Sequence, residues 1–130
     1  MKQRFQLRAE RGQTMVEFAI VLPVLMLVVF AIIQLGILWN NYVALTDAVR
    51  AGARTAAVSR TAPDPVGATI QRVKDATGDL NQADLAVSVV SGWNHGDDVT
   101  VTATYPYSIS LFGLVVKSGD LKSTTTERVE

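Results

Sequence analysis

The sequence has no cysteine and a single histidine among its 130 residues. Without thiols it can form no disulfide, no thiolate metal site and no thiol nucleophile. Nucleophile elbows, phosphate-binding loops and zinc-protease motifs are also missing, and His95 lies in a polar, turn-like run with Asp97 and Asp98. We therefore expect no enzyme, with no catalytic residue, no metal ligand and no cofactor.

Net charge is missing too, since 12 Lys and Arg residues balance 12 Asp and Glu residues. A broad basic surface is therefore absent, and we expect no nucleic-acid binding. The charges are nevertheless distributed unevenly. Against Glu10 alone, four bases stand at the N-terminal end of the chain: Lys2, Arg4, Arg8 and Arg11. By the positive-inside rule, this end stays in the cytoplasm and the C-terminal part is exported.

What the sequence does have is one long apolar run. From Phe18 to Trp39 every residue is apolar, Gly or Pro, except Gln34. At about 1.5 Å of rise per residue, a helix of this length spans a hydrocarbon core of about 30 Å. A cleavable secretory signal has a shorter apolar core followed by small residues, whereas bulky residues follow here. We predict a retained single-pass helix in the cytoplasmic (inner) membrane.

A lone acid, Glu17, stands at the edge of this run. A carboxylate is costly beside hydrocarbon, and Arg11 lies six residues earlier, off the same helix face. We expect that the helix supplies no partner and that the charge comes from another molecule, such as an amino terminus freed by cleavage after Gly12. The alternative is that Gly12 only ends a flexible leader and that Glu17 is a helix-start acid favoured by the helix dipole.

Two segments carry a family resemblance: RGQTMVEFAIVLPVLML, from Arg11, and YVALTDAVRAGARTAAV, from Tyr42. Gly12, Glu17 and Phe18 resemble the cleavage signature of type IV pilin-like precursors. Together the segments are similar to the TadE family of minor pilins, or pseudopilins, of the tight-adherence (Tad, or Flp) pilus. The resemblance is strong from Arg11 to Val58 and weak beyond it.

The resemblance implies a processing site, with Gly12 as the last leader residue and Gln13 as the first mature residue. Glu17, followed by Phe18, would then compensate the amine of an adjacent subunit during assembly. Cyclisation of an N-terminal Gln13 would weaken this pairing but not the cleavage. The implied partners are a prepilin peptidase, other pilin subunits and minor pilins, the Tad inner-membrane assembly platform with its ATPase machinery, and membrane lipid.

We therefore expect a minor pilin or pseudopilin, processed after Gly12 and acting in pilus assembly or initiation. Its C-terminal head would be extracytoplasmic, and the protein could become part of the pilus. The alternative is an uncleaved single-span membrane protein with an extracytoplasmic binding or sensory domain. Cleavage discriminates between the two.

The expected fold is α+β, with a long N-terminal transmembrane helix that continues into a small pilin-like head with a short antiparallel sheet. Residues 1–12 form the basic leader, 13–60 the helix and its extension, and 61–130 the head. Pro23 predicts a kink, because proline removes an amide from the helix ladder. Small residues recur every fourth position and form one narrow face: Ala44, Ala48, Gly52 and Ala56. This face predicts close packing, either under the protein's own sheet or along a dimer seam.

Within the head, the prolines of 61–65 break the first helix, and Asp64 predicts the N-cap of a short helix ending at Gly78. Residues 85–91 and 99–105 predict a β-hairpin, the second with strict alternation of Thr and apolar residues. We expect Pro106 to end that strand, 108–116 to form a loop or short helix, and 120–129 to supply a third strand.

Overall fold

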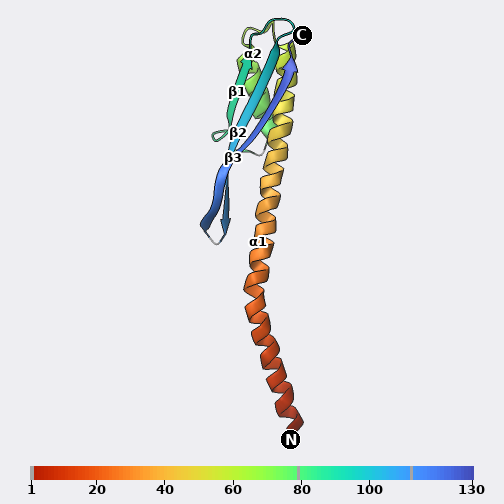
Figure 1. The fold of residues 1–130 in the computed structure, drawn as a ribbon, viewed down its shortest axis with the longest axis vertical. Helices are drawn as coiled ribbons and strands as arrows, with labels where there is room; N and C mark the ends of the chain where they lie inside the picture. Colours follow the sequence, from red (N-terminus) through yellow and green to blue (C-terminus); the bar gives the residue numbers. More distant parts are fainter. Residues whose placement is uncertain (1, 79, 112) are drawn as a thin grey trace.

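The computed structural model describes residues 2–78, 80–111 and 113–130, with side chains from Gly12 onward in these ranges. The elements, in order, are α1 (Lys2–Val58), α2 (Pro65–Thr77), β1 (Ala86–Ser91), β2 (Asp98–Leu111) and β3 (Leu114–Arg128). One long helix thus carries a small head at its C-terminal end (Figure 1). The predicted α+β architecture is confirmed.

Helix α1 is a single element of 57 residues with Pro23 inside it. At about 1.5 Å per residue it is roughly 85 Å long. It runs as one continuous coil from the leader into the head (Figure 1). Pro23 therefore does not divide the helix, which ends at Val58, shortly before Pro63 of the following loop.

Helix α2 begins where the sequence predicts it. Asp64 is the N-cap, and its Oδ1 accepts a hydrogen bond from the Gly67 amide at 2.8 Å. Pro65 occupies the first turn, where its missing amide costs nothing. Gly78 is the C-cap with a φ of 52°, in the left-handed region that glycine adopts without penalty.

The sheet is an antiparallel meander in the order β1-β2-β3. The predicted hairpin is present, with Ala86 opposite Thr104 and Ser91 opposite Val99. Along β2 the apolar residues from Val99 to Ala103 point into the core, while the alternating threonines face outward. Two cross-strand threonine pairs on that outer face have their hydroxyl oxygens 3.0 Å apart: Thr100 with Thr126 and Thr102 with Thr124.

The prediction that Pro106 ends the second strand is wrong. Strand β2 continues to Leu111, and Pro106 lies opposite Asp120 of β3. Because β1 begins at Ala86, opposite Thr104, β2 has a neighbour on one side only from Tyr105 onward. Proline lacks an amide donor but is tolerated on such an edge strand.

The expectation of a loop or short helix over 108–116 is also wrong. This segment forms the end of the β2–β3 hairpin, where Leu111 pairs with Leu114. Gly113 at the tip has a φ of 82°, which favours glycine there. The third strand accordingly begins at Leu114, six positions before the predicted start at Asp120.

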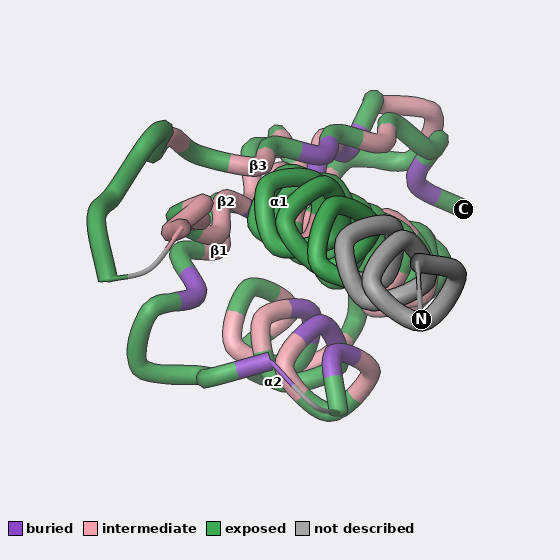
Figure 2. Tube along the Cα trace, turned by 90° about the horizontal axis from the view of Figure 1, so that it is seen from below, coloured by how far each residue is buried: buried purple, intermediate pink, exposed green. Residues whose placement is uncertain are grey.

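The core of the head lies around the C-terminal part of α1. Seen along the stem, α1 lies between the sheet and α2 (Figure 2), and it contacts α2, β2 and β3. The tail of the chain closes the core, because Val129 is buried and the Glu130 amide donates to the Ala57 carbonyl at 2.9 Å. The central buried apolar residues are Leu45, Ala48, Val49, Ala53, Ala56, Val73, Val99, Val101 and Ala103.

Candidate membrane anchor and processing site

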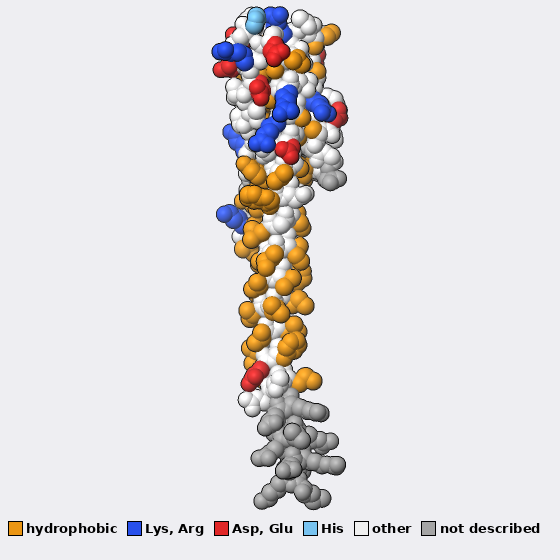
Figure 3. All heavy atoms as spheres, turned by 90° about the vertical axis from the view of Figure 1, so that its right-hand side faces the viewer, with side chains coloured by type: hydrophobic (Ala, Val, Ile, Leu, Met, Phe, Trp, Pro, Cys, Tyr) orange, Lys and Arg blue, Asp and Glu red, His pale blue; other side chains and the backbone are white. Residues whose placement is uncertain are grey.

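The N-terminal part of α1 is an uncovered apolar stem. One stretch of the described residues, within Gly12–Val58, is apolar and long enough to cross a membrane. No residue of its most apolar 18-residue window is buried in the head. The space-filling view shows hydrophobic side chains along the stem and charged side chains gathered on the head (Figure 3).

This exposure distinguishes the stem from the core helix of a soluble protein, which its own chain would cover. The same helix then contributes Leu45, Ala48 and Val49 to the core of the head. Discarding the whole helix as a signal sequence would therefore remove the centre of the core. The geometry fits a helix that anchors the head in a membrane.

The residues of the proposed processing site lie at the start of this stem. Gly12, Gln13, Glu17 and Phe18 are all exposed and all helical. A Cβ built on Gly12 would meet no heavy atom within 4 Å. The structure thus brings these residues onto two successive turns of one helix, away from the head. Pro23 lies further along the same exposed stem.

The expectation that the helix supplies no partner for Glu17 is wrong. Gln13 Nε2 donates a hydrogen bond to Glu17 Oε1 at 3.2 Å, across one helical turn. The signal was in the sequence, since residues four positions apart face each other on a helix. Gln13 is neutral, however, so this bond satisfies an oxygen without compensating the carboxylate charge.

The small-residue face of α1 is occupied by the protein's own head. Ala48, Gly52 and Ala56 are buried and Ala44 is half-buried. A Cβ on Gly52 would overlap Val73 Cγ2 of α2 and would lie 3.7 Å from Val101 Cγ1 of β2. Of the two readings of this face, packing inside the chain is the one observed, and the buried positions are not open to a second helix.

The exposed face of the same segment carries a charge pair. Arg50 Nη1 lies 3.5 Å from Asp47 Oδ1, and both side chains are more than half exposed. An exposed pair of this kind contributes little to stability, because water screens it. Arg54 is exposed on the helix turn after Arg50.

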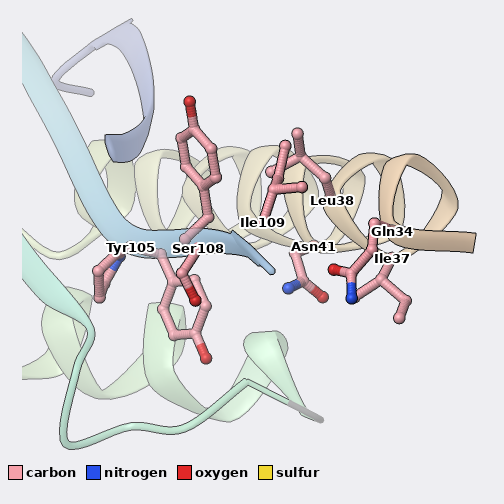
Figure 4. A pocket seen from close by; sticks show the side chains of 9 residues that line it. Gln34, Ile37, Leu38, Asn41, Tyr105, Ser108 and Ile109 are labelled. Carbon is pink, nitrogen blue, oxygen red and sulfur yellow. The ribbon is translucent and has the colours of Figure 1, made fainter. Parts of the chain in front are cut away.

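Where the stem meets the head, α1 and β2 enclose a cleft of about 210 Å³. Gln34, the polar exception in the apolar run, lines it and is half-buried. Figure 4 shows the residues on the two walls. Those labelled are Gln34, Ile37, Leu38 and Asn41 from α1, and Tyr105, Ser108 and Ile109 from β2.

No group of three or more His, Asp or Glu residues suited to a metal ion occurs in the part of the chain that the structure describes. His95 is exposed. The carboxylate of Asp97 has a local role, because its Oδ2 accepts bonds from the amide and the side chain of Asn94 at 3.1 and 2.8 Å. These bonds close the turn between β1 and β2.

Comparison with known proteins finds a family resemblance in helix α1. Residues 12–54 match the family model described as TadE-like protein. No curated protein and no solved structure matches the chain. The matched segment runs from Gly12 along the apolar stem into the buried part of α1. Over these residues the chain is TadE-like, consistent with a TadE-like protein of the Tad pilus system.

Proposed function

We propose that this chain is a minor pilin or pseudopilin of the Tad (Flp) pilus, cut after Gly12 by a prepilin peptidase. One observation carries the proposal: the TadE-like segment, residues 12–54, coincides with the exposed apolar stem and the part of α1 that is buried in the head. Its first residue is the glycine after which we place the cut. The helix is continuous across this position, so peptidase access requires local opening or a bound, unwound leader.

The stem suits a subunit that moves from membrane to filament. Most of its large apolar side chains between Met15 and Val43 are exposed. In a bilayer, lipid covers them. In an assembly, the apolar helices of other pilin subunits replace the lipid, so that the transfer exposes little apolar surface to water.

Glu17 would direct this packing through its charge. After cleavage, Gln13 carries the new α-amine of its own chain, while its side-chain amide remains one helical turn from Glu17. The amide is neutral and does not compensate a carboxylate charge. An ammonium group from an adjacent subunit supplies the missing charge, and an ion pair shielded by apolar helices is stronger than one in water.

The proposed orientation places the leader in the cytoplasm and the head outside, following the basic residues of the leader. The protein would then act in assembly or initiation of the pilus, in contact with the inner-membrane assembly platform and its ATPase machinery. The stem would be a long apolar helix like that of other pilins, and the head would add a small folded domain outside the membrane.

The test is the intact mass and N-terminal sequence of the protein recovered from its own membranes, with and without the host prepilin peptidase. We expect a peptidase-dependent start at Gln13, with or without loss of ammonia from cyclisation. Gly12→Leu should block this processing. Gly36→Leu is the matched control, because position 36 is also an exposed helical glycine with no heavy atom within 4 Å of its Cβ.

A start at Met1 under both conditions would contradict the proposal. It would favour the alternative, a permanently anchored single-span protein with a binding or sensory head. Processing of the Gly12→Leu variant at the same position as the parent would remove Gly12 from the cleavage site.

A further inference from the structure

The β2–β3 hairpin extends beyond the head. Strand β1 pairs with β2 only as far as Thr104, whereas β2 and β3 remain paired up to Leu111 and Leu114. The outer part of the hairpin is therefore a two-stranded ribbon. Figure 1 shows it descending from the head beside the stem, toward the N-terminal end of α1.

The ribbon reaches the apolar run of the stem. Its Pro106 and Ile109 line the cleft whose other wall includes Ile37 and Leu38 of α1 (Figure 4). The pairs Ser110–Val115 and Leu111–Leu114 follow Ile109 and lie still further from the head. The tip is thus at the level of the segment 18–39, which is the part of the chain apolar enough to span a membrane.

The tip is apolar where a solvent-exposed hairpin end is usually polar. Leu114, Val115 and Val116 are 75%, 64% and 63% exposed. Three consecutive exposed apolar residues are unfavourable in water and typical of a contact surface. Lys117 follows them directly and is exposed, which places a cation at the base of the apolar tip.

Aromatic residues stand on the stem beside the cleft, on the head side of the tip. Trp39 is 70% exposed, and its ring lies 6.2 Å from that of Tyr42. Tyr107, half-buried, is on the neighbouring ribbon. Tryptophan and tyrosine gather at the boundary between hydrocarbon and water, where the ring is buried and its polar group stays hydrated.

We propose that the hairpin tip, Leu111 with Leu114–Val116, is a second membrane contact, inserted into the interfacial layer of the bilayer that α1 spans. The inference rests on the membrane anchoring proposed above. Because an open strand edge is not tolerated in hydrocarbon, the tip occupies the headgroup layer and not the bilayer centre. Lys117 faces lipid phosphates, and the exposed side chains of Leu114–Val116 reach the first part of the acyl chains.

This contact determines which part of α1 lies in the hydrocarbon core of the bilayer. With Lys117 and Trp39 at the level of the headgroups and the apolar tip at the boundary between headgroups and acyl chains, the hydrocarbon begins near Gln34 and extends toward Phe18. At about 1.5 Å per residue, these positions span roughly 24 Å, most of a hydrocarbon core. Two attachment points also restrict rotation of the head about the stem, so that the subunit presents a fixed face to its assembly partners.

We favour lipid over a second copy of the chain as the partner of the tip, because the tip and the apolar stem face the same bilayer. The tip and the apolar stem belong to one molecule, and the ribbon descends along the stem (Figure 1), so a bilayer that covers the stem up to the level of the tip also meets the tip. The cation beside the apolar residues complements anionic headgroups.

The experiment uses the full chain, which lacks cysteine, so that one introduced thiol is labelled uniquely. Leu114→Cys carries an environment-sensitive fluorophore in vesicles of phosphatidylcholine and phosphatidylglycerol. Ser88→Cys, exposed on β1 of the head, is the control for water, and Val24→Cys, exposed on the stem, is the control for the membrane interior. Spin-labelled lipids then report the depth of each probe.

We expect blue-shifted emission at position 114 with quenching by lipids labelled near the headgroup, deep quenching at position 24, and neither effect at position 88. Quenching at position 24 without quenching at position 114 would overturn the second contact and leave the anchor in place. No quenching at position 24 would remove the anchor and the inference together. A blue shift at position 114 that lipids do not quench, and that fades when the protein is diluted in lipid, would assign the tip to a second copy and overturn the proposal.

Discussion

Gly52 of α1 lies so close to Val73 of α2 that a Cβ at position 52 would overlap the valine Cγ2. The two helices meet at this point with no side chain on one of them. Thr69 O of α2 and Val101 of β2 are also within 4 Å of the same position. The anchor helix is therefore joined to the head through a contact in which α2 and β2 both approach the α1 backbone.

Gly52→Ala should destabilise the head. Val73 is buried and β-branched, so it has little freedom to rotate away from an added methyl group. We expect the free energy of unfolding to fall by about 1–3 kcal/mol, the usual cost of overpacking. It is measured by urea titration of the full chain in detergent, following Trp93 fluorescence in a Trp39→Phe background.

Two controls test the cause of this loss. Gly36→Ala adds the same methyl group to the same helix where nothing lies within 4 Å, and it should leave the head unchanged. Val73→Ala should cost stability alone but relieve part of the loss caused by Gly52→Ala, because the two residues are coupled. Strictly additive effects of the two substitutions would show that the close contact is not the cause.

Asp64→Ala should lower the stability of the head by about 1 kcal/mol, because Asp64 Oδ1 accepts the Gly67 amide at the start of α2. Asp75→Ala is the matched control, because it also removes a carboxylate, here from the exposed side of α2. The Asp75 carboxylate accepts a hydrogen bond from the exposed Gln71 side chain at 2.8 Å and caps no helix end. This substitution should cost about 0.2–0.5 kcal/mol. Equal effects in the same urea titration would contradict a capping role for Asp64.

Val129→Ala should loosen the end of the chain that closes the core. Val129 is buried and its amide donates to the Asp97 carbonyl at 2.8 Å, so the substitution deletes two methyl groups from a fixed position. We expect a loss of about 2 kcal/mol from lost burial and the resulting cavity. Val90→Ala makes the same deletion at a valine that is exposed, and should be nearly neutral. A neutral Val129→Ala would mean that the tail does not contribute to the core.

Local signals predicted most of the fold. The apolar run, the small residues at every fourth position and the Asp64-Pro65 pair specify helices through chemistry that acts within a few residues. The alternation from Val99 to Ala103 likewise reports one buried face of a strand. These features need no knowledge of distant partners, and the structure has them where the sequence places them.

The long β2–β3 hairpin was not predicted because its length depends on a partner strand. By local rules Pro106 and Gly113 both interrupt a strand. Pairing with β3 nevertheless extends β2 beyond Pro106, and the chain turns into β3 at Gly113. The level of the tip beside α1 is a property of the tertiary fold alone. The bond from Gln13 to Glu17 is different, since it joins residues four positions apart and follows from local helix geometry.

Glu17 should act through its charge and not through its bond to Gln13. Glu17→Gln keeps an oxygen that can accept from Gln13 Nε2 but abolishes the charge, while Gln13→Ala removes the intrachain donor and keeps the charge. We expect Glu17→Gln to insert into membranes at the parental level but to lose incorporation into the pilus or its assembly complex. Gln13→Ala should remain competent wherever processing proceeds.

Membrane fractionation and recovery in sheared pili or in the purified assembly complex measure the two properties separately, and N-terminal sequencing verifies processing of each variant. An ion pair with a neighbouring amine predicts that only the charge matters at position 17, so that Glu17→Asp retains part of the function and Glu17→Gln retains none. Parental incorporation of Glu17→Gln would exclude the amine pairing. Failure of Gln13→Ala despite correct processing would instead assign the role to the amide bond within the helix.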